Sequence, residues 1–202
     1  MTFWRHSNPL VLASKSASRQ ALLRAACIPF DVIVSDINER AVEQSAFAST
    51  PAEVAQVLAV AKAQAVSQNE PSRYVIGADQ TLAIGSRRLS KPRDRMEARE
   101  HLRAMSGTTH ELHSAFTLVQ GGKTMRAGVA TARMTMRALS EDMIEAYLDE
   151  AGEDVLKSVG AYQLEGLGLH LFDRIEGDYF TILGLPMLLL LAALRDEALL
   201  LT

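Results

Sequence analysis

The chain has 202 residues, of which 48% are hydrophobic and 22% are charged. It is therefore long enough and apolar enough to bury a sizeable core, and we expect one globular domain over residues 1–202 that can consist of two lobes. The formal net charge of -3 argues against a general electrostatic hold on nucleic acid or on an anionic membrane, so any anionic substrate must be bound by local cations.

The cysteine count and the two most apolar stretches suggest where the protein works. Cys27 is the only cysteine, which excludes an intrachain disulfide and a multi-cysteine zinc site. The N-terminal segment is interrupted by polar residues and a proline between positions 5 and 9, so it lacks the continuous core of a signal peptide. The run at 182–194 has 13 residues and contains Pro186, whereas a membrane span needs about 20 apolar residues. We expect a cytoplasmic protein in which this run forms a buried helix.

The first third of the chain predicts strands that alternate with helices. Residues 10–13 are apolar and predict a buried strand, and the serine-rich turn after them leads into a helical pattern. A second strand is expected over 30–34. Thr50 and Glu53 then form a capping box around a proline, which predicts a helix from about 51 to 68.

The middle of the chain predicts two short strands, a helix and a hairpin. The short strands are expected at 74–76 and 81–84. Asp94 opens a capping box for a helix that ends near residue 105. Residues 111–137 predict strands on either side of a Gly-Gly pair, and residues 129–137 alternate between two faces, which indicates a hairpin.

The last third predicts two more helices. Ser140 is expected to cap a helix that Gly152 terminates. A glycine-punctuated stretch with strand-like pieces covers 160–184, before the final apolar helix. The alternation of strands and helices, together with the hairpin, predicts an α/β fold with a mixed sheet.

The segment from Ser14 to Arg19 is the first candidate for ligand binding. It places hydroxyl groups and two cations at the start of a helix, where backbone N–H groups favour an anion such as a phosphate. The alternative is that one serine only caps the helix while Lys15 and Arg19 are solvated. We expect Arg19, like Lys91 further along, to lie in an exposed turn.

Asp79, Lys62 and Lys91 are further candidates that gain weight only together. Asp79 is expected just past an apolar strand, where α/β sheets present ligand-binding groups, so that it can hold a metal or activate water. Its alternative role is an ordinary turn aspartate. Lys62 lies at the boundary of an apolar helix stripe, and most such lysines only reach to water. Lys91 precedes a proline in an extended segment and by itself indicates no more than a surface lysine.

A series of short motifs runs along nearly the whole chain. The motifs are Leu12-Ala-Ser-Lys-Ser-Ala-Ser-Arg19 with Leu22-Leu23, Ile37-Asn-Glu39, Ala61-Lys-Ala63, Gly77-Ala-Asp-Gln80, Lys91-Pro-Arg-Asp94, Ser106-Gly107, Gly160-Ala-Tyr162, Glu165-Gly166 and Gly184-Leu-Pro186. Each motif is weak alone, but their order and spacing make a specific signal, and together they resemble the Maf family of nucleoside triphosphate pyrophosphatases. The chain departs from the family at Asn38, where Asp is common, at Ala17, where Pro is common, and near Ser158, where many members carry Lys and this chain has Lys157 beside it.

The resemblance implies a fold, a reaction and a set of roles. The implied fold is an elongated mixed sheet flanked by helices, in two lobes with a central cleft, as in the related ITPase-like proteins. The implied reaction is metal-dependent hydrolysis of a nucleoside triphosphate to a monophosphate and pyrophosphate, with Mg²⁺ or Mn²⁺ as the cofactor. In this sequence the roles fall on Asp79 as general base and metal ligand, on Glu39 as a metal ligand, and on Ser14, Arg19, Lys62 and Lys91 as phosphate ligands.

Two positions bear on the base of the nucleotide. Gln80 and Glu165 resemble the branch of the family that acts on 7-methyl-GTP, whereas the branch that prefers dTTP, UTP and CTP typically has Thr and Gln there. A carboxylate suits 7-methylguanine because methylation gives the base a delocalised positive charge. The alternative is a purely structural ion pair or turn cap at Glu165. Two rival functions also remain, a pyrimidine-nucleotide pyrophosphatase and a regulator of cell division that binds nucleotide without hydrolysing it. A homodimer is the default expectation for assembly.

Overall fold

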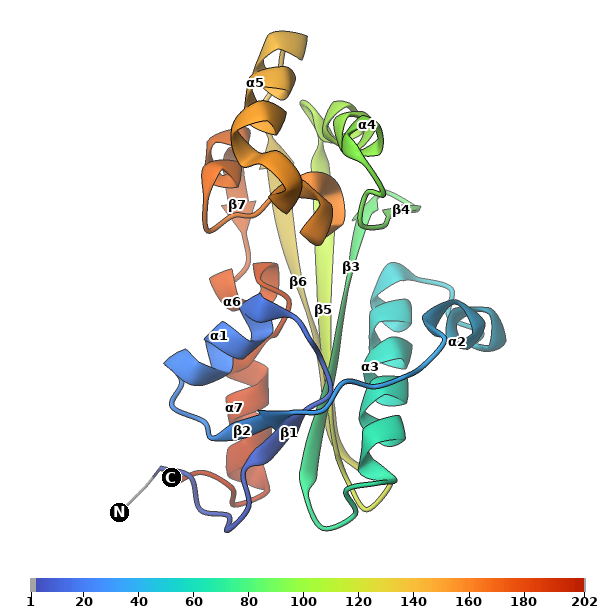
Figure 1. Cartoon of the computed structure of the whole chain (residues 1–202), viewed down its shortest axis with the longest axis vertical. Coiled ribbons are helices and arrows are strands. Elements are labelled where there is room, and N and C mark those ends of the chain that lie inside the picture. Colours follow the sequence, from blue (N-terminus) through green and yellow to red (C-terminus); the bar gives the residue numbers. More distant parts are fainter. Residues whose placement is uncertain (1–2, 202) are drawn as a thin grey trace. The chain divides into compact units, whose positions relative to one another are not determined.

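A computed structural model describes residues 3–201. The strands are β1 (Leu10–Leu12), β2 (Phe30–Val32), β3 (Tyr74–Ile84), β4 (Arg87–Leu89), β5 (Thr109–Gln120), β6 (Lys123–Met136) and β7 (Phe172–Glu176) (Figure 1). The α-helices are α1 (Ala17–Ala25), α2 (Glu39–Ser45), α3 (Pro51–Ser67), α4 (Arg95–Met105), α5 (Glu141–Ala151), α6 (Tyr179–Ile182) and α7 (Met187–Asp196). Three 3-10 helices, η1 (Gly152–Lys157), η2 (Val159–Ala161) and η3 (Leu167–Leu171), connect α5 to β7.

The pairing of the strands confirms a mixed α/β fold. The hydrogen-bonded order is β2-β1-β3-β5-β6-β7, and β4 pairs with β3. Strand β1 runs parallel to β2 and β3, whereas β3 is antiparallel to β4 and β6 is antiparallel to β7. The turn between β5 and β6 has positive φ angles at Gly121 and Gly122, which a two-residue hairpin turn of this kind requires.

The chain divides into two compact units. The first contains the residues up to Gln80, His113–Ala130 and the segment from Asp178 onward, and the second contains Thr81–Leu112 and Thr131–Gly177. Strands β3, β5 and β6 therefore each contribute residues to both units. The cleft that the resemblance implies stays a prediction.

The core of the first unit has apolar clusters on both faces of β1, because successive residues of a strand face opposite ways. Leu10 and Leu12 of β1 pack with the buried residues of α1 and α7, such as Leu23 and Leu194. Val11, between them, packs in a second cluster with apolar residues of α3. Figure 1 shows α1 and α7 on one side of β1 and α3 on the other. Helix α3 starts where the sequence predicts, since the reciprocal hydrogen bonds of its capping box are both present.

The second unit packs α4 against α5, η1 and η2. Its buried residues include Leu102 and Met105 of α4, Met134 and Met136 of β6, and Tyr162. The alternation predicted for 129–137 is confirmed, because Ala132, Met134 and Met136 are buried while Thr131, Arg133 and Arg137 are exposed.

Several sequence predictions of secondary structure were wrong. The two short strands at 74–76 and 81–84 are one continuous strand, β3. Helix α2 and strand β4 were missed, and the stretch 160–184 contains a single strand, β7, together with the end of η2, all of η3 and the short helix α6. Helix α7 is only partly buried, because Leu188 is 60% and Leu189 is 44% exposed. No helix among residues 3–201 is long and apolar enough to cross a membrane.

Candidate active site

Arg19 lies in the first turn of α1 and points into the first unit. Ser16 caps this helix by accepting a hydrogen bond from the Arg19 backbone N–H. The guanidinium donates from Nε to the Gly184 carbonyl oxygen at 2.8 Å, and from Nη1 to the Ala78 carbonyl oxygen at 2.7 Å and to Ser14 Oγ at 3.2 Å. Arg19 is only 8% exposed, so the expectation of an exposed turn was wrong for this residue. The tertiary contacts to Ala78 and Gly184 bury it.

Asp79 lies inside β3 rather than past its end. Gly77, two residues earlier, permits this because a Cβ atom there would lie 2.0 Å from the Ala59 carbonyl oxygen and 2.6 Å from the Ala63 nitrogen. The strand can therefore run directly against α3 only with glycine at this position. The close approach brings Asp79 to the side chain of Lys62, which projects from α3.

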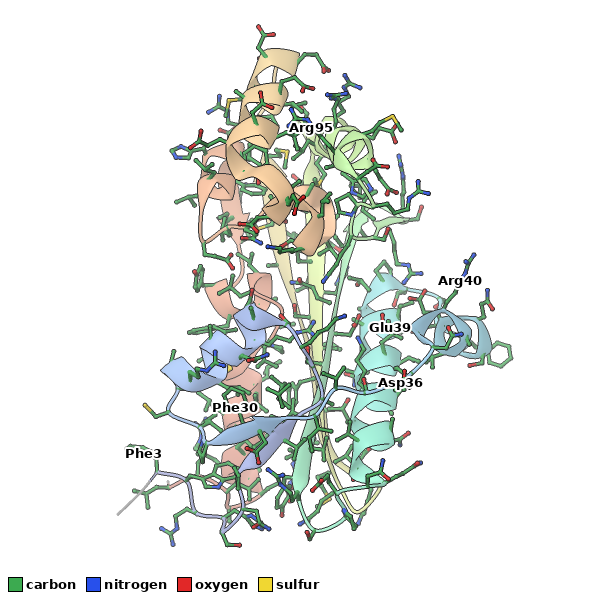
Figure 2. All side chains as sticks on the ribbon, in the orientation of Figure 1. Phe3, Phe30, Asp36, Glu39, Arg40 and Arg95 are labelled. Atoms are coloured by element: carbon green, nitrogen blue, oxygen red, sulfur yellow. The ribbon has the colours of Figure 1, made fainter. Side chains whose placement is uncertain are left out.

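Lys62 joins two carboxylates in a buried cluster. Its Nζ lies 2.5 Å from Oδ1 of Asp79 and 2.8 Å from Oε1 of Glu39. Lys62 and Asp79 are each 8% exposed, whereas the Glu39 side chain is 53% exposed. Figure 2 shows Glu39 where α2 begins, beside α3. Lys62 is therefore not one of the many boundary lysines that reach to water.

Burial dominates the electrostatics of this cluster. It raises the pKa of Asp79 above the usual value for a carboxyl group, and the positive charges of Lys62 and Arg19 oppose that shift only in part. It also lowers the pKa of Arg19, against the attraction of Asp79 and Glu39. A carboxyl group with a raised pKa, held beside two cations, is the kind of group that can accept a proton from water near neutral pH.

Gln80, next in the chain, points its amide at a turn near the end of the chain. Its Nε2 lies 3.0 Å from Ser114 Oγ, 3.1 Å from the Thr181 carbonyl oxygen and 2.9 Å from the Ile182 carbonyl oxygen. Ser114 and Thr181 were not singled out from the sequence, because neither lies in a segment that carries the family resemblance. Gly184 was noticed only as part of the Gly184-Leu-Pro186 segment.

Comparison with known proteins identifies the family. A family model described as Maf-like protein matches residues 9–197. The chain belongs to the Maf-like family. It is 58% identical over 200 residues to a protein of Rhodopseudomonas palustris (strain BisB18) named nucleoside triphosphate pyrophosphatase, with 99% of each chain covered. It is 53% identical over 190 residues to a protein of Brucella suis named 7-methyl-GTP pyrophosphatase, with 93% of this chain and 96% of the relative covered.

A structural likeness is weaker than these sequence matches. The structure of a Ham1 protein from Coxiella burnetii aligns with a TM-score of 0.44 and 18% sequence identity, over 63% of this chain and 72% of the other. The assignment to the Maf-like family rests on the sequence matches and not on this likeness.

Ser14, Arg19, Glu39, Lys62, Asp79 and Gln80 all belong to the first unit of this Maf-like chain, together with Ser114, Thr181 and Gly184. Lys91 and Glu165, the two remaining sequence candidates, belong to the second unit, and both are exposed. Lys91 precedes the buried Pro92 ahead of α4 and is exposed as expected, but the segment around it is irregular and not a turn. Lys157, the possible substitute for the cation that many Maf members carry near Ser158, is exposed and lies 2.5 Å from Asp154.

Glu39 and Asp79 are the residues of this Maf-like chain suited to hold a divalent metal ion. Their oxygens both contact Lys62 Nζ, so two carboxylates already converge on one positive charge. No group of three or more His, Cys, Asp and Glu side chains arranged to bind a metal occurs within residues 3–201. That donor set fits Mg²⁺, which usually takes one or two carboxylates and completes its shell with water and substrate phosphates.

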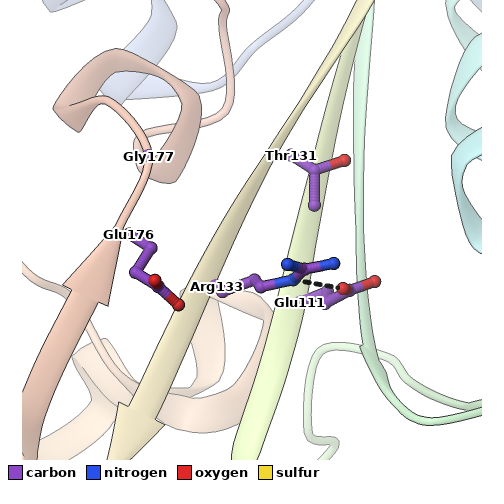
Figure 3. Close-up of a pocket in the computed structure, with 5 residues that line it drawn as sticks. All are labelled: Glu111, Thr131, Arg133, Glu176 and Gly177. Carbon is purple, nitrogen blue, oxygen red and sulfur yellow. Dashed lines mark hydrogen bonds and ion pairs between the residues drawn. The ribbon is translucent and has the colours of Figure 1, made fainter.

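The second unit contains an open pocket of about 350 Å³ that the sequence did not predict. It is lined by Glu111, Thr131, Arg133, Glu176 and Gly177 (Figure 3). Arg133 Nε lies 2.9 Å from Glu111 Oε1. None of the predicted site residues lines this pocket, and no buried carboxylate lies in it.

Proposed function

We propose that this chain is a nucleoside triphosphate pyrophosphatase that hydrolyses its substrate to a nucleoside monophosphate and pyrophosphate. The observation that supports this most strongly is the buried cluster of Asp79, Lys62 and Arg19 in the first unit. It combines a carboxyl group of raised pKa with two cations, at positions that match the motifs of a family whose close relatives are named for this activity.

The reaction needs a proton acceptor and strong charge neutralisation. Asp79 accepts a proton from the water molecule that attacks the α-phosphorus, and the bond from that phosphorus to the oxygen bridging to the β-phosphate breaks, so pyrophosphate leaves. Lys62 and Arg19 neutralise the triphosphate, which would otherwise repel the attacking oxygen. Ser14 supplies a hydroxyl beside Arg19, and Lys91 is proposed to supply a further cation.

Glu39 and Asp79 would hold Mg²⁺ or Mn²⁺. A bound divalent ion supplies further neutralisation of charge on the phosphate oxygens. Within the chain itself, Lys62 pairs with both carboxylates. It therefore reduces the repulsion between the two negative charges when no other cation lies between them.

We propose that the nucleobase of the substrate is a modified guanine and that 7-methyl-GTP is the preferred substrate. Gln80 and Glu165 support this, because the branch of the family with that preference resembles this chain at both positions. A second support is the relative from Brucella suis that is named 7-methyl-GTP pyrophosphatase. The Glu165 carboxylate would stabilise the positive charge of the methylated base. UTP and dTTP offer no such charge.

The test is pyrophosphate release from 7-methyl-GTP, GTP, UTP and dTTP with Mg²⁺ or Mn²⁺, and again with EDTA. We expect the highest kcat/KM for 7-methyl-GTP, loss of activity with EDTA, and a smaller preference in Glu165→Gln. Asp79→Asn should lower the rate about 10²–10⁴-fold, the usual contribution of a general base. Asp31→Asn is the matched control, because Asp31 is an exposed carboxylate of the same unit that pairs with Arg73.

Each part of the proposal has its own contrary result. A folded Asp79→Asn variant with the activity of the wild type would remove Asp79 from the mechanism. Equal or faster turnover of UTP or dTTP would refute the 7-methyl-GTP preference and leave the reaction type standing. Tight nucleotide binding with no pyrophosphate released would favour the regulatory rival instead.

A further inference from the structure

The amide nitrogen of Gln80, the residue that follows Asp79 in the chain, is already engaged in hydrogen bonds. Both oxygens at Thr181 and Ile182 are backbone carbonyls, which only accept hydrogen bonds. The amide nitrogen of Gln80, and not its oxygen, must therefore face them. This fixes the orientation of the side chain and leaves only Oε1 to meet a ligand.

The contacts of Gln80 converge on one carbonyl oxygen. The Thr181 oxygen accepts from Gln80 Nε2 at 3.1 Å, from Ser114 Oγ at 2.6 Å and from the Gly184 backbone N–H at 3.1 Å. Ser114 and Thr181 are both 0% exposed. The bond from the Gly184 N–H closes residues 181–184 into a turn. The side chains of Gln80 and Ser114 both donate to this turn and so hold it in place.

The same turn carries the oxygen that holds Arg19. Gly184 accepts the Nε hydrogen of Arg19 at 2.8 Å. A Cβ atom on Gly184 would lie 3.4 Å from Gln80 Oε1 and 3.5 Å from Arg19 Nε. Gly184 thus lies beside both the Gln80 side chain and the Arg19 guanidinium.

We propose that Gln80 and Ser114 are positioning residues that fix the 181–184 turn and, through the Gly184 carbonyl oxygen, aim the Arg19 guanidinium at the phosphates. This rests on the proposed function for the identity of the ligand. It assigns to Gln80 an effect on the phosphate end of the substrate, and it gives Ser114 and Thr181 a role. A threonine at position 80 is shorter than glutamine and would leave the Thr181 and Ile182 oxygens without this donor.

The chain offers a matched control. Gln56 of α3 donates from Nε2 to Thr117 Oγ1 at 2.7 Å and lies 3.5 Å from the Phe116 carbonyl oxygen. This is also a glutamine amide bonded to a buried hydroxyl of β5 and to a backbone oxygen, but its partners are not in the turn. Gln80→Met and Gln56→Met therefore remove the same kind of interaction from two places.

The first measurement does not depend on catalysis. The Nε–H of Arg19, identified by its loss in Arg19→Lys, is followed by NMR for exchange with solvent. We expect slow exchange in the wild type and in Gln56→Met, and at least about 10-fold faster exchange in Gln80→Met, because the acceptor at Gly184 is no longer held. Ser114→Ala, which removes less volume, should also make the exchange of this hydrogen faster. It replaces Gln80→Met in the experiment if Gln80→Met does not fold. Unchanged exchange in the folded variants would overturn the proposal.

The second measurement is a double-mutant cycle on kcat/KM. Misplacing a binding group by about 1 Å can cost about 10²-fold, so we expect Gln80→Met to lower kcat/KM about 10-fold or more and Gln56→Met to leave it within about twofold. In an Arg19→Lys background, Gln80→Met should add less than about twofold. If the reductions in kcat/KM caused by Gln80→Met and by Arg19→Lys simply multiply in the double variant, Gln80 does not act through Arg19 and the proposal is refuted. A wild type that releases no pyrophosphate would refute the proposed function, while the exchange measurement would still decide the positioning role.

Discussion

His110 makes a specific pH dependence of stability testable. Its side chain is 0% exposed, and burial lowers its pKa to about 4 from an ordinary value of 6.5. Nε2 lies 2.7 Å from the Tyr162 hydroxyl oxygen, and Nδ1 has no hydrogen-bond partner among the described residues. The folded protein therefore holds this histidine neutral at a pH where the unfolded chain protonates it.

The sign and size of the effect follow from this difference. The stability that neutral His110 supplies is fully present above about pH 6.5, falls as the pH decreases from there, and stops falling below about pH 4. Each pKa unit is worth about 1.4 kcal/mol, so the unfolding free energy should fall by about 2 kcal/mol at about pH 5 and about 3 kcal/mol at about pH 4 from this group alone. Other groups titrate in the same range and must be subtracted.

Urea unfolding of the wild type and of His110→Gln between about pH 4 and pH 7 isolates the contribution of His110 to the unfolding free energy. Glutamine keeps a nitrogen for Tyr162 and does not titrate. The difference between the two unfolding free energies should change by about 1.2 kcal/mol between about pH 6 and pH 5. His170→Gln is the control, because His170 is exposed in the same unit. A pH-independent difference between wild type and His110→Gln would refute the reasoning.

Two further predictions concern the elements that present the site. Gly77→Ala should lower the unfolding free energy by about 3 kcal/mol or more, because its Cβ would lie 2.0 Å from the Ala59 oxygen and 2.6 Å from the Ala63 nitrogen, both of them backbone atoms; an unchanged urea midpoint would contradict this. Asn38→Ala removes the N-cap of α2, a loss of about 1 kcal/mol, and should raise the Mg²⁺ or Mn²⁺ concentration needed for half-maximal activity because α2 carries Glu39. Asn38→Asp keeps a capping oxygen and should behave as the wild type; equal metal requirements in all three proteins would count against Glu39 as a ligand.

Local signals in the sequence predicted most of the helices and the hairpin. The Thr50 and Glu53 capping box, the Gly121-Gly122 turn and the Ser140 cap are satisfied by residues within a few positions of each other. The partners of such interactions are close in sequence, so a short sequence window contains the signal for them.

The local signals failed where tertiary contacts override them. The Gly-Ala-Asp-Gln segment at 77–80 looked like an interruption between two strands, but it continues β3 because glycine lets the strand lie against α3. Helix α2 was missed because it is short and has no buried residue, so it shows no apolar stripe.

By itself the sequence determined the family and the mixed α/β class, through motifs whose order and spacing can be read along the chain, and it named most of the side chains now proposed for the site. Only the tertiary structure decided how deeply those side chains are buried and which groups they contact. Arg19 was expected in an exposed turn, yet it is buried by a carbonyl oxygen 165 positions away, and Lys62 meets Asp79 across 17 positions. Burial and the distance to neighbouring charges set a pKa and the orientation of an amide, and both depend on residues that come together only when the chain folds.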